Sequence, residues 1–218
     1  MIKKRKNDID LIIFDLDGTL LDTALYIVLD YTHLFDKYHK KCPTLEEMVY
    51  FSGPPLEQVL SKYFPDVPLK ELVDEFHDYS LKHSNDYSSL YPNEIKVLEE
   101  LKKANYKLAV LTTKSKESVK DNLTHFGLIS FFDEIVPIDL CLRPKPDPYG
   151  VKLILDKLHI EPKRTFAIGD SPSDLTCASP LGCKTGLVTW GLKHIPEVKR
   201  DEEYASFSDI ERSFIIND

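Results

Sequence analysis

Short runs of apolar residues alternate along this chain with longer stretches in which apolar residues recur every three or four positions. The runs predict buried strands at 11–14, 107–111, 134–136, 165–168 and 185–189. The longer periodicity predicts helices at about 93–104, 115–126 and 147–158. Strands that are apolar throughout are typical of a parallel sheet buried on both faces. The pattern therefore predicts an α/β fold, a Rossmann-like parallel sheet core with helices on both faces.

Residues 22–88 interrupt this alternation, because they contain helical periodicity and no convincing strand. The apolar spacing predicts helices at 22–41, 55–64 and 69–83, with Pro43 and Thr44 ending the first. We expect three or four helices to form a small α-helical domain with its own aromatic-rich core. The catalytic or binding core would then be discontinuous, made of 1–21 and 89–218.

Capping residues predict several helix boundaries. Ser115 can cap a helix that stops near Gly127. Asp147 followed by Pro148 predicts an N-cap with a proline in the first turn. After the strand at 165–168, Ser173 predicts the cap of a short helix.

The chain has 218 residues, a net charge of −8 and a sequence pI near 5.4. This charge argues against nonspecific attraction to nucleic acid or to an anionic membrane. No apolar stretch approaches the ~20 residues that a membrane-spanning helix needs. The basic start lacks a following secretory core, so we expect a cytoplasmic protein with no membrane or nucleic-acid partner.

The four cysteines show no Cys-x-x-Cys spacing. They are Cys42, Cys141, Cys177 and Cys183. In a cytoplasmic chain of this size we expect reduced, structural thiols. A zinc site is a remote alternative, because none of the seven histidines forms a ligand-spaced pair with these cysteines.

Two acids follow the first predicted strand, in the string Asp15-Leu16-Asp17-Gly18-Thr19. Side chains two residues apart in an extended segment point the same way, and Gly18 allows a sharp turn. Carboxylate oxygens suit Mg²⁺, and a carboxylate can also be a nucleophile toward phosphorus. The pattern indicates a cation and phosphate site, although two acids with a Gly after a strand are also typical of a solvated turn.

Further polar residues follow other predicted strands. Thr112 ends one strand, Asp170 and Asp174 follow another, and Lys145 lies in a loop between them. The carboxyl ends of parallel strands share one edge of a sheet, where ligands bind. Each residue also has an ordinary interpretation: Thr112 as a strand residue, Lys145 as a surface lysine, and the acids as part of a helix-opening loop.

Taken together, the order of strand-DxDGT, strand-Thr, Lys and strand-GDxxxD resembles the four motifs of the haloacid dehalogenase-like hydrolase superfamily. The segments 51–56, 91–92, 143–148 and 168–174 are similar to its phosphoglycolate phosphatase-like branch, which carries a helical cap between the first two motifs. The resemblance covers nearly the whole chain and assigns 22–88 to the cap. Thr113 and Asn93 depart from it, since that branch often has Asn and Gly there.

The resemblance implies the chemistry of the acids. Asp15 would be the nucleophile, and Asp17 would be the general acid and base. Mg²⁺ would be held by Asp15, the main-chain carbonyl of Asp17 and Asp170. Asp174 would stand outside this set and orient a bound water or Lys145.

It also implies which groups hold the substrate. Thr112, Lys145 and the turn of Gly18 and Thr19 would contact the phosphoryl group, with Thr113 beside it. Ser52 and Gly53, in a Gly/Pro-rich loop of the cap, would approach the leaving group; that loop is alternatively a simple turn.

The function implied is a Mg²⁺-dependent phosphatase that hydrolyses a small soluble phosphomonoester, phosphoglycolate-like, through an aspartyl-phosphate. A phosphomutase resembling β-phosphoglucomutase, a pyrophosphatase and a nucleotidase are alternatives that use the same acids. A non-catalytic phosphate-binding module ranks last, because the motif residues are intact. We expect a small phosphorylated metabolite as the partner, and a monomer or a homodimer.

Overall fold

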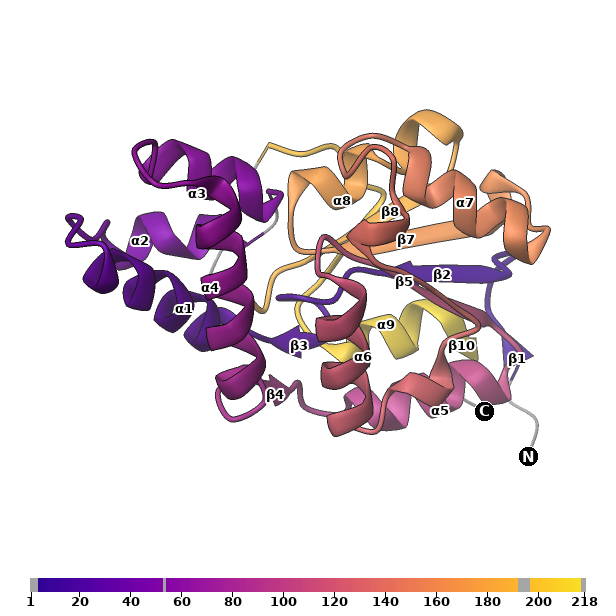
Figure 1. Ribbon diagram of the computed structural model, residues 1–218. Helices are drawn as coiled ribbons and strands as arrows, with labels where there is room; N and C mark the ends of the chain where they lie inside the picture. The colour runs from indigo at the N-terminus through magenta and orange to yellow at the C-terminus, as the bar shows by residue number, and fades with distance from the viewer. Residues whose placement is uncertain (1–3, 53, 192–196, 217–218) are drawn as a thin grey trace.

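The computed structural model describes residues 4–52, 54–191 and 197–216. Its centre is a six-stranded sheet in the order β6-β5-β2-β7-β8-β9, in which neighbouring strands are parallel (Figure 1). The strands are β2 (Leu11–Phe14), β5 (Lys107–Leu111), β6 (Glu134–Val136), β7 (Thr165–Gly169), β8 (Lys184–Val188) and β9 (Glu202–Tyr204). The predicted α/β fold with a Rossmann-like parallel sheet is confirmed.

Alternate side chains of the central strands enter two separate hydrophobic clusters. Ile12 of β2 and its register partner Phe166 belong to one cluster, and the next pair, Ile13 and Ala167, belongs to the other. The first is covered by α5 (Glu94–Lys103), α6 (Lys116–His125) and α9 (Phe207–Phe214). The second is covered by α7 (Tyr149–Leu158) and by Cys177 and Ala178, which follow α8 (Pro172–Thr176). The sheet is therefore buried on both faces, which explains why its central strands are apolar throughout.

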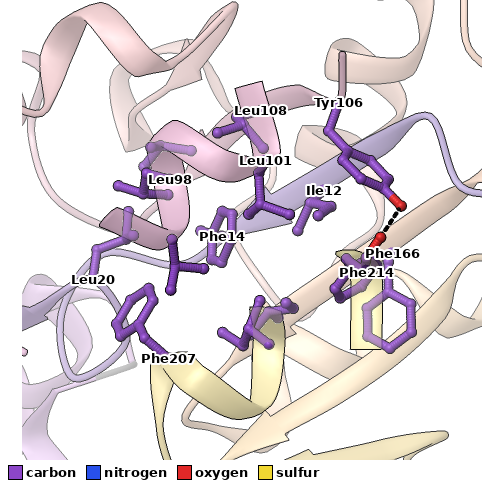
Figure 2. Close-up of a cluster of buried hydrophobic side chains, with 14 of the residues drawn as sticks. Ile12, Phe14, Leu20, Leu98, Leu101, Tyr106, Leu108, Phe166, Phe207 and Phe214 are labelled. Carbon is purple, nitrogen blue, oxygen red and sulfur yellow. Dashed lines mark hydrogen bonds between the residues drawn. The ribbon is translucent and has the colours of Figure 1, made fainter. Parts of the chain in front are cut away.

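The chain after residue 189 adds elements that the sequence pattern did not predict. Strand β9 extends the sheet, and α9 places Phe207 and Phe214 against the first cluster (Figure 2). The Tyr106 hydroxyl donates a 2.8 Å hydrogen bond to the Phe214 carbonyl within this cluster. Strand β10 (Ile215–Ile216) then pairs antiparallel with β1 (Lys4–Arg5), so both ends of the described chain meet.

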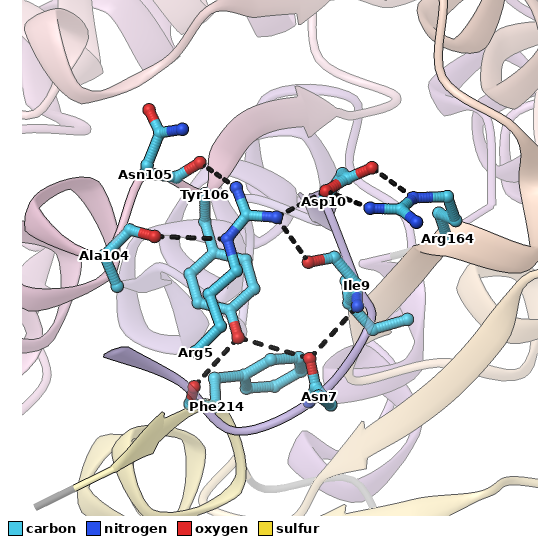
Figure 3. A network of polar contacts seen from close by, with 9 residues as sticks. All are labelled: Arg5, Asn7, Ile9, Asp10, Ala104, Asn105, Tyr106, Arg164 and Phe214. Atoms are coloured by element: carbon cyan, nitrogen blue, oxygen red, sulfur yellow. Dashed lines mark hydrogen bonds and ion pairs between the residues drawn. The ribbon is translucent and has the colours of Figure 1, made fainter. Parts of the chain in front are cut away.

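A polar network fastens the N-terminal segment at the edge of the sheet where β2 begins (Figure 3). Asp10 lies between Arg5 and Arg164, which form ion pairs with it, and the Arg5 guanidinium lies 4.7 Å from the centre of the Tyr106 ring. Arg164 and Arg5 lower the pKa of Asp10 against the opposing effect of burial. This network lies at the amino ends of the strands, so its charges stabilise the fold away from the predicted site.

The helices between residues 22 and 88, called the helical segment below, pack around a third hydrophobic cluster. Its helices are α1 (Ala24–Lys37), α2 (Leu45–Met48), α3 (Leu56–Tyr63) and α4 (Leu69–His83), with a 3₁₀ turn at Val49–Phe51. Aromatic rings fill this cluster. The rings of Tyr31 and Phe51, for example, pack edge to face with their centres 4.7 Å apart. Strands β3 (Leu21–Asp22) and β4 (Ser89–Leu90) pair antiparallel where the chain enters and leaves the segment. The division into a core and a cap at residues 22 and 88 stays a prediction.

The boundaries between the first two helices differ from the prediction. The first helix ends at Lys37 instead of 41, because Tyr38 is its C-cap and His39 adopts φ 51°, outside the helical region. Thr44 also begins α2 instead of only interrupting a helix. Its side chain accepts from the Glu47 N–H, and Glu47 accepts from the Thr44 N–H in return.

The cap of α8 is Ser171, not Ser173. The Ser171 hydroxyl and N–H both contact Asp174, which occupies the third position of the helix. The prediction at Ser115 is confirmed, since its hydroxyl accepts from the Ser118 N–H at 3.3 Å. Asp147 accepts from the Tyr149 N–H at 2.9 Å, although α7 itself begins at Tyr149, after Pro148.

The four cysteines are free thiols, as predicted, and two of them, Cys177 and Cys183, are buried. Burial raises the pKa of each of these two thiols, to about 12 and about 11. Both are therefore unreactive packing residues at neutral pH. Among the helices described, none has the length and apolar character needed to cross a membrane.

Candidate active site

The predicted polar residues meet at the carboxyl ends of three neighbouring strands. Asp15 follows β2, Thr112 follows β5 and Asp170 follows β7. The sheet order places β2 between the other two, so the three side chains emerge at one edge. All three are buried, although they are polar. Buried polar groups at a strand edge need partners, and the partner of Asp15 comes from a segment 130 residues later in the sequence.

Lys145 supplies the positive charge at this edge. Its ammonium group lies 2.7 Å from an Asp15 oxygen and 2.5 Å from an Asp174 oxygen, and it donates to the Leu111 carbonyl at 3.1 Å. Only 6% of Lys145 is exposed. Burial opposes its charge, but Asp15 and Asp174 outweigh burial and raise the pKa of Lys145 above its usual value. Lys145 is thus a permanently charged partner of two carboxylates and not a surface lysine.

The acids themselves are crowded. Oxygen atoms of Asp15, Asp170 and Asp174 lie within 4.8 Å of one another. Burial, followed by the neighbouring Asp174 charge, raises the pKa of Asp15, against the opposing effect of Lys145. Among the residues that the structure describes, these three carboxylates surround one lysine ammonium and offer only oxygen atoms, which suits a divalent cation that prefers oxygen ligands.

Gly18 has a specific role in this crowding. Its φ is +82°, and a Cβ at this position would overlap the carboxylate of Asp170. A side chain here would both strain the backbone and displace an acid of the cluster. The N–H of Gly18 donates to the Leu21 carbonyl at 2.8 Å, and that of Thr19 donates to the Leu16 carbonyl at 3.3 Å. These N–H groups close the turn itself, so their predicted contact with a phosphoryl group stays a prediction.

The remaining hydroxyls of the predicted set differ in their surroundings. Thr112 accepts a 3.1 Å hydrogen bond from the Lys114 N–H, which leaves its own hydroxyl proton for a ligand. The Thr19 hydroxyl is fully buried and has no hydrogen bond among the described residues. Thr113 and Ser52 line a cavity beside the acids. Gly53 lies outside the described residues.

Asp17 has different partners from Asp15. One of its carboxylate oxygens accepts from the Lys114 ammonium at 2.8 Å and from the Tyr26 hydroxyl at 3.2 Å. Lys114 also donates to the Asn122 side chain at 2.6 Å and lies over the Tyr26 ring at 4.6 Å. Asp17 is thus held by a core lysine and a tyrosine of α1, and it faces the helical segment.

Lys114 and Asn122 are functional candidates that the sequence analysis did not select. Lys114 follows Thr112 and Thr113 at the carboxyl end of β5, which is the signal that could have indicated it. Asn122 lies on α6 and is completely buried, with bonds to Ser84 and Asn85 at the end of α4. Its position in the middle of a polar helix gives no sequence signal.

A cavity of about 240 Å³ lies between this edge and the helical segment. Its described lining comes from both parts: Asp17, Thr113 and Lys114 from the sheet edge, and Tyr31 and Phe76 from α1 and α4. A smaller space of about 30 Å³ adjoins Gly18 and Asp170. A reacting group bound at the acids would therefore have its remaining part in the larger cavity.

Comparison with known proteins agrees with this geometry. Residues 12–188 match the family model described as haloacid dehalogenase-like hydrolase. The chain is 35% identical over 185 residues to the pyrophosphatase PpaX of Bacillus velezensis, covering 84% of each chain, and 30% identical over 205 residues to PpaX of Bacillus mycoides, covering 93% of this chain and 95% of the relative.

Solved structures have the same fold. A haloacid dehalogenase-like family hydrolase of Streptococcus pneumoniae superposes with a TM-score of 0.84 at 26% identity, over 94% of this chain and 98% of the other. A predicted phosphoglycolate phosphatase of Haemophilus somnus superposes with a TM-score of 0.81 at 25% identity, over 95% of this chain and 98% of the other. On the family match, the sequence relatives and the four motifs in place, the chain belongs to the haloacid dehalogenase-like hydrolases.

Proposed function

We propose that the chain is a Mg²⁺-dependent phosphatase that hydrolyses a small soluble phosphomonoester through an aspartyl-phosphate on Asp15. The carrying observation is the Asp15 carboxylate, buried at the strand edge with Lys145 at 2.7 Å and two further acids beside it. A fixed carboxylate next to a fixed ammonium is suited to attack phosphorus, because the ammonium offsets the charge of the phosphoryl oxygens.

The residues present fit a magnesium ion. The cluster of Asp15, Asp170 and Asp174 offers only oxygen donors, which Mg²⁺ prefers. Asp15 and Asp170 would hold the ion together with the main-chain carbonyl of Asp17, since Asp174 is already bonded to Lys145 and Ser171. When bound, Mg²⁺ would supply positive charge against the repulsion between Asp15 and the phosphoryl group.

The protein groups then divide the reaction between them. An Asp15 oxygen attacks phosphorus while Lys145 and the Thr112 hydroxyl contact phosphoryl oxygens. Asp17, which lines the cavity, gives its proton to the departing oxygen and then takes one from the water that hydrolyses the aspartyl-phosphate. Lys114 and Tyr26 hold the Asp17 carboxylate in place during both steps.

The helical segment would act as a cap over this site. Its closure would exclude water during the first step and reopen for product release. Ser52 and Gly53 remain candidates for contacts with the leaving group. A cytoplasmic location and a monomeric or homodimeric state also remain predictions.

A pyrophosphatase is the second candidate, favoured by the name of the relatives at 30–35% identity. It would use the same acids, with phosphate as the leaving group. A phosphomutase would return the phosphoryl group to a sugar, so that sugar phosphates interconvert without release of phosphate. Phosphate release with Mg²⁺ from a panel of esters and pyrophosphate distinguishes these functions.

The decisive variant is Asp15→Asn. We expect loss of phosphate release on every substrate from a protein that still folds in a thermal melt without Mg²⁺, because the amide removes the nucleophile while Lys145 keeps Asp174 as its ion-pair partner. Mg²⁺-dependent stabilisation in the melt should also weaken, which reports on the site without relying on activity. Asp156→Asn, an exposed position on α7, is the matched control. Retention of a large part of the activity by Asp15→Asn would refute Asp15 as the nucleophile.

A further inference from the structure

The cavity above Asp17 has mostly apolar walls on the side of the helical segment. Tyr31, Phe51 and Phe76 contribute rings, and Ile27 and Val73 contribute aliphatic side chains. The rings lie close together: the centre of the Tyr31 ring is 4.7 Å from that of Phe51 and 5.1 Å from that of Phe76. Such walls bind an apolar or aromatic body, by burial of its surface and by edge-to-face contacts.

Charge at the cavity is predominantly negative. Asp17, Glu57 and Asp139 line it, and Lys114 is the one lysine or arginine among its described lining residues. The Lys114 ammonium is already bonded to Asp17 and Asn122. A leaving group with two or more negative charges, such as phosphate, would enter this space against repulsion and beside apolar walls.

The size of the cavity limits the body that it accepts. A cavity of about 150 Å³ lined by aliphatic and aromatic side chains holds one benzene molecule. The volume here is about 240 Å³, which leaves room for a single six-membered ring and a short linker to the phosphoryl oxygen. Two fused rings with a linker would fill or exceed it.

We propose that the substrate is a phosphomonoester whose leaving group is an uncharged alcohol carrying one apolar six-membered ring, bound among Tyr31, Phe51 and Phe76. This inference rests on the proposed phosphatase function and narrows its substrate class. For benzyl phosphate the reaction is balanced as follows. The bond from phosphorus to the benzyl oxygen breaks as the bond to Asp15 forms, Asp17 protonates the benzyl oxygen, and water then releases phosphate and restores both acids.

The test compares benzyl phosphate, ethyl phosphate and pyrophosphate with Mg²⁺. Benzyl and ethyl alcohol are leaving groups of similar acidity, so their difference reports on the ring. We expect kcat/KM for benzyl phosphate to exceed that for ethyl phosphate by about 10- to 100-fold, the value for burial of one phenyl ring. Pyrophosphate should be hydrolysed more slowly than benzyl phosphate.

Val73→Phe tests the position of the ring, because a larger side chain at this half-buried site would fill the cavity. It should lower kcat/KM for benzyl phosphate by about 10- to 100-fold relative to that for ethyl phosphate, since a filled cavity excludes the ring. Val28→Phe is the matched control, a half-buried valine of α1 outside the cavity lining. Should Val73→Phe not fold, Phe76→Leu widens the same wall and should improve 2-naphthylmethyl phosphate relative to benzyl phosphate.

The outcomes separate the inference from the function on which it rests. Equal rates for benzyl and ethyl phosphate would overturn the ring-bearing leaving group and keep the phosphomonoester phosphatase. Preferential hydrolysis of pyrophosphate would overturn the ring-bearing leaving group and favour the second candidate, the pyrophosphatase. An equal fall for all three substrates in Val73→Phe would overturn the proposed position of the ring. Absence of turnover on all three with folded protein and Mg²⁺ would overturn the phosphatase function and this inference with it.

Discussion

Replacement of Lys145 by methionine should destabilise the protein strongly, although it removes a single charge. Met has nearly the same length and an apolar stem, so the packing volume is kept. What is lost is the ammonium group 2.7 Å from Asp15 and 2.5 Å from Asp174. Two buried carboxylates would then lose the ammonium that they share, beside a third acid within 4.8 Å.

The magnitude follows from the burial of the pair. Removing one partner of a buried ion pair costs about 3–5 kcal/mol, because the remaining charge cannot be hydrated. That is a large part of the ~5–15 kcal/mol that stabilises a typical protein. Burial already raises the pKa of Asp15, so protonation of this group relieves part of the cost as the pH falls. The loss should therefore be largest at about pH 8 and smaller at about pH 5.

Urea denaturation in EDTA measures the free energy of unfolding of both proteins. Lys96→Met is the control, because the Lys96 side chain is 61% exposed in its pair with Glu211 and should cost about 0–1 kcal/mol. Addition of Mg²⁺ should stabilise Lys145→Met more than wild type, since a cation replaces the missing ammonium. A loss below about 1 kcal/mol in EDTA at pH 8 would refute the view that Lys145 holds the acids together.

Three further changes test other parts of the molecule. Gly18→Ala should weaken Mg²⁺-dependent stabilisation in a thermal melt because it displaces Asp170, whereas Gly127→Ala, at φ +70° with open space around it, should show only the backbone cost of about 1–2 kcal/mol. Asp17→Asn should slow hydrolysis of alkyl phosphates by about 10²–10⁴-fold, and a smaller effect on aryl phosphates checks the acid role. Burial raises the pKa of Glu94 from 4.5 to about 8. The protonated Glu94 side chain therefore contributes fully to the stability of the folded protein below pH 4.5, its pKa in the unfolded chain, and this contribution is lost as the pH rises to about 8. The unfolding free energy of Glu94→Gln minus that of wild type should therefore increase between pH 5 and 8, by about 3–4 kcal/mol, and a flat difference would contradict the shifted pKa.

The parallel sheet was predictable because its inner strands carry their own signal. β2 and β7 are buried along their whole length, so burial on both faces requires apolar residues at every position. β9 lacks this signal, because it is an edge strand in which only Tyr204 is buried. The missed helix α9 has apolar residues at Phe207, Ile210 and Phe214, which is a helical spacing, but it spans only eight residues and follows an edge strand with little signal of its own.

The residues of the candidate site could be found from the sequence for a related reason. Parallel strands end at a common edge, so polar residues directly after apolar runs must be neighbours whatever the loops between them do. The Lys145 contacts required more than this rule, because its loop approaches the edge from 29 residues before Asp174 and 130 after Asp15. The sequence analysis placed the cap of α8 at Ser173, whereas Asp174 forms the capping hydrogen bonds with Ser171. The sequence pattern did not show this pairing, and Asp174 also accepts a hydrogen bond from the distant Lys145.

The surroundings of Asp17 could not be predicted in this way, because they are built by tertiary contacts between three separated elements. Lys114 donates one hydrogen bond to Asp17 and a second one to Asn122 of α6. Asn122 in turn donates to Ser84 and Asn85, where the chain leaves α4. A continuous series of hydrogen bonds therefore links the end of the helical segment to the proposed general acid. The position of this acid depends on the docking of that segment, so a change in the cap can alter catalysis without touching a residue of the four motifs.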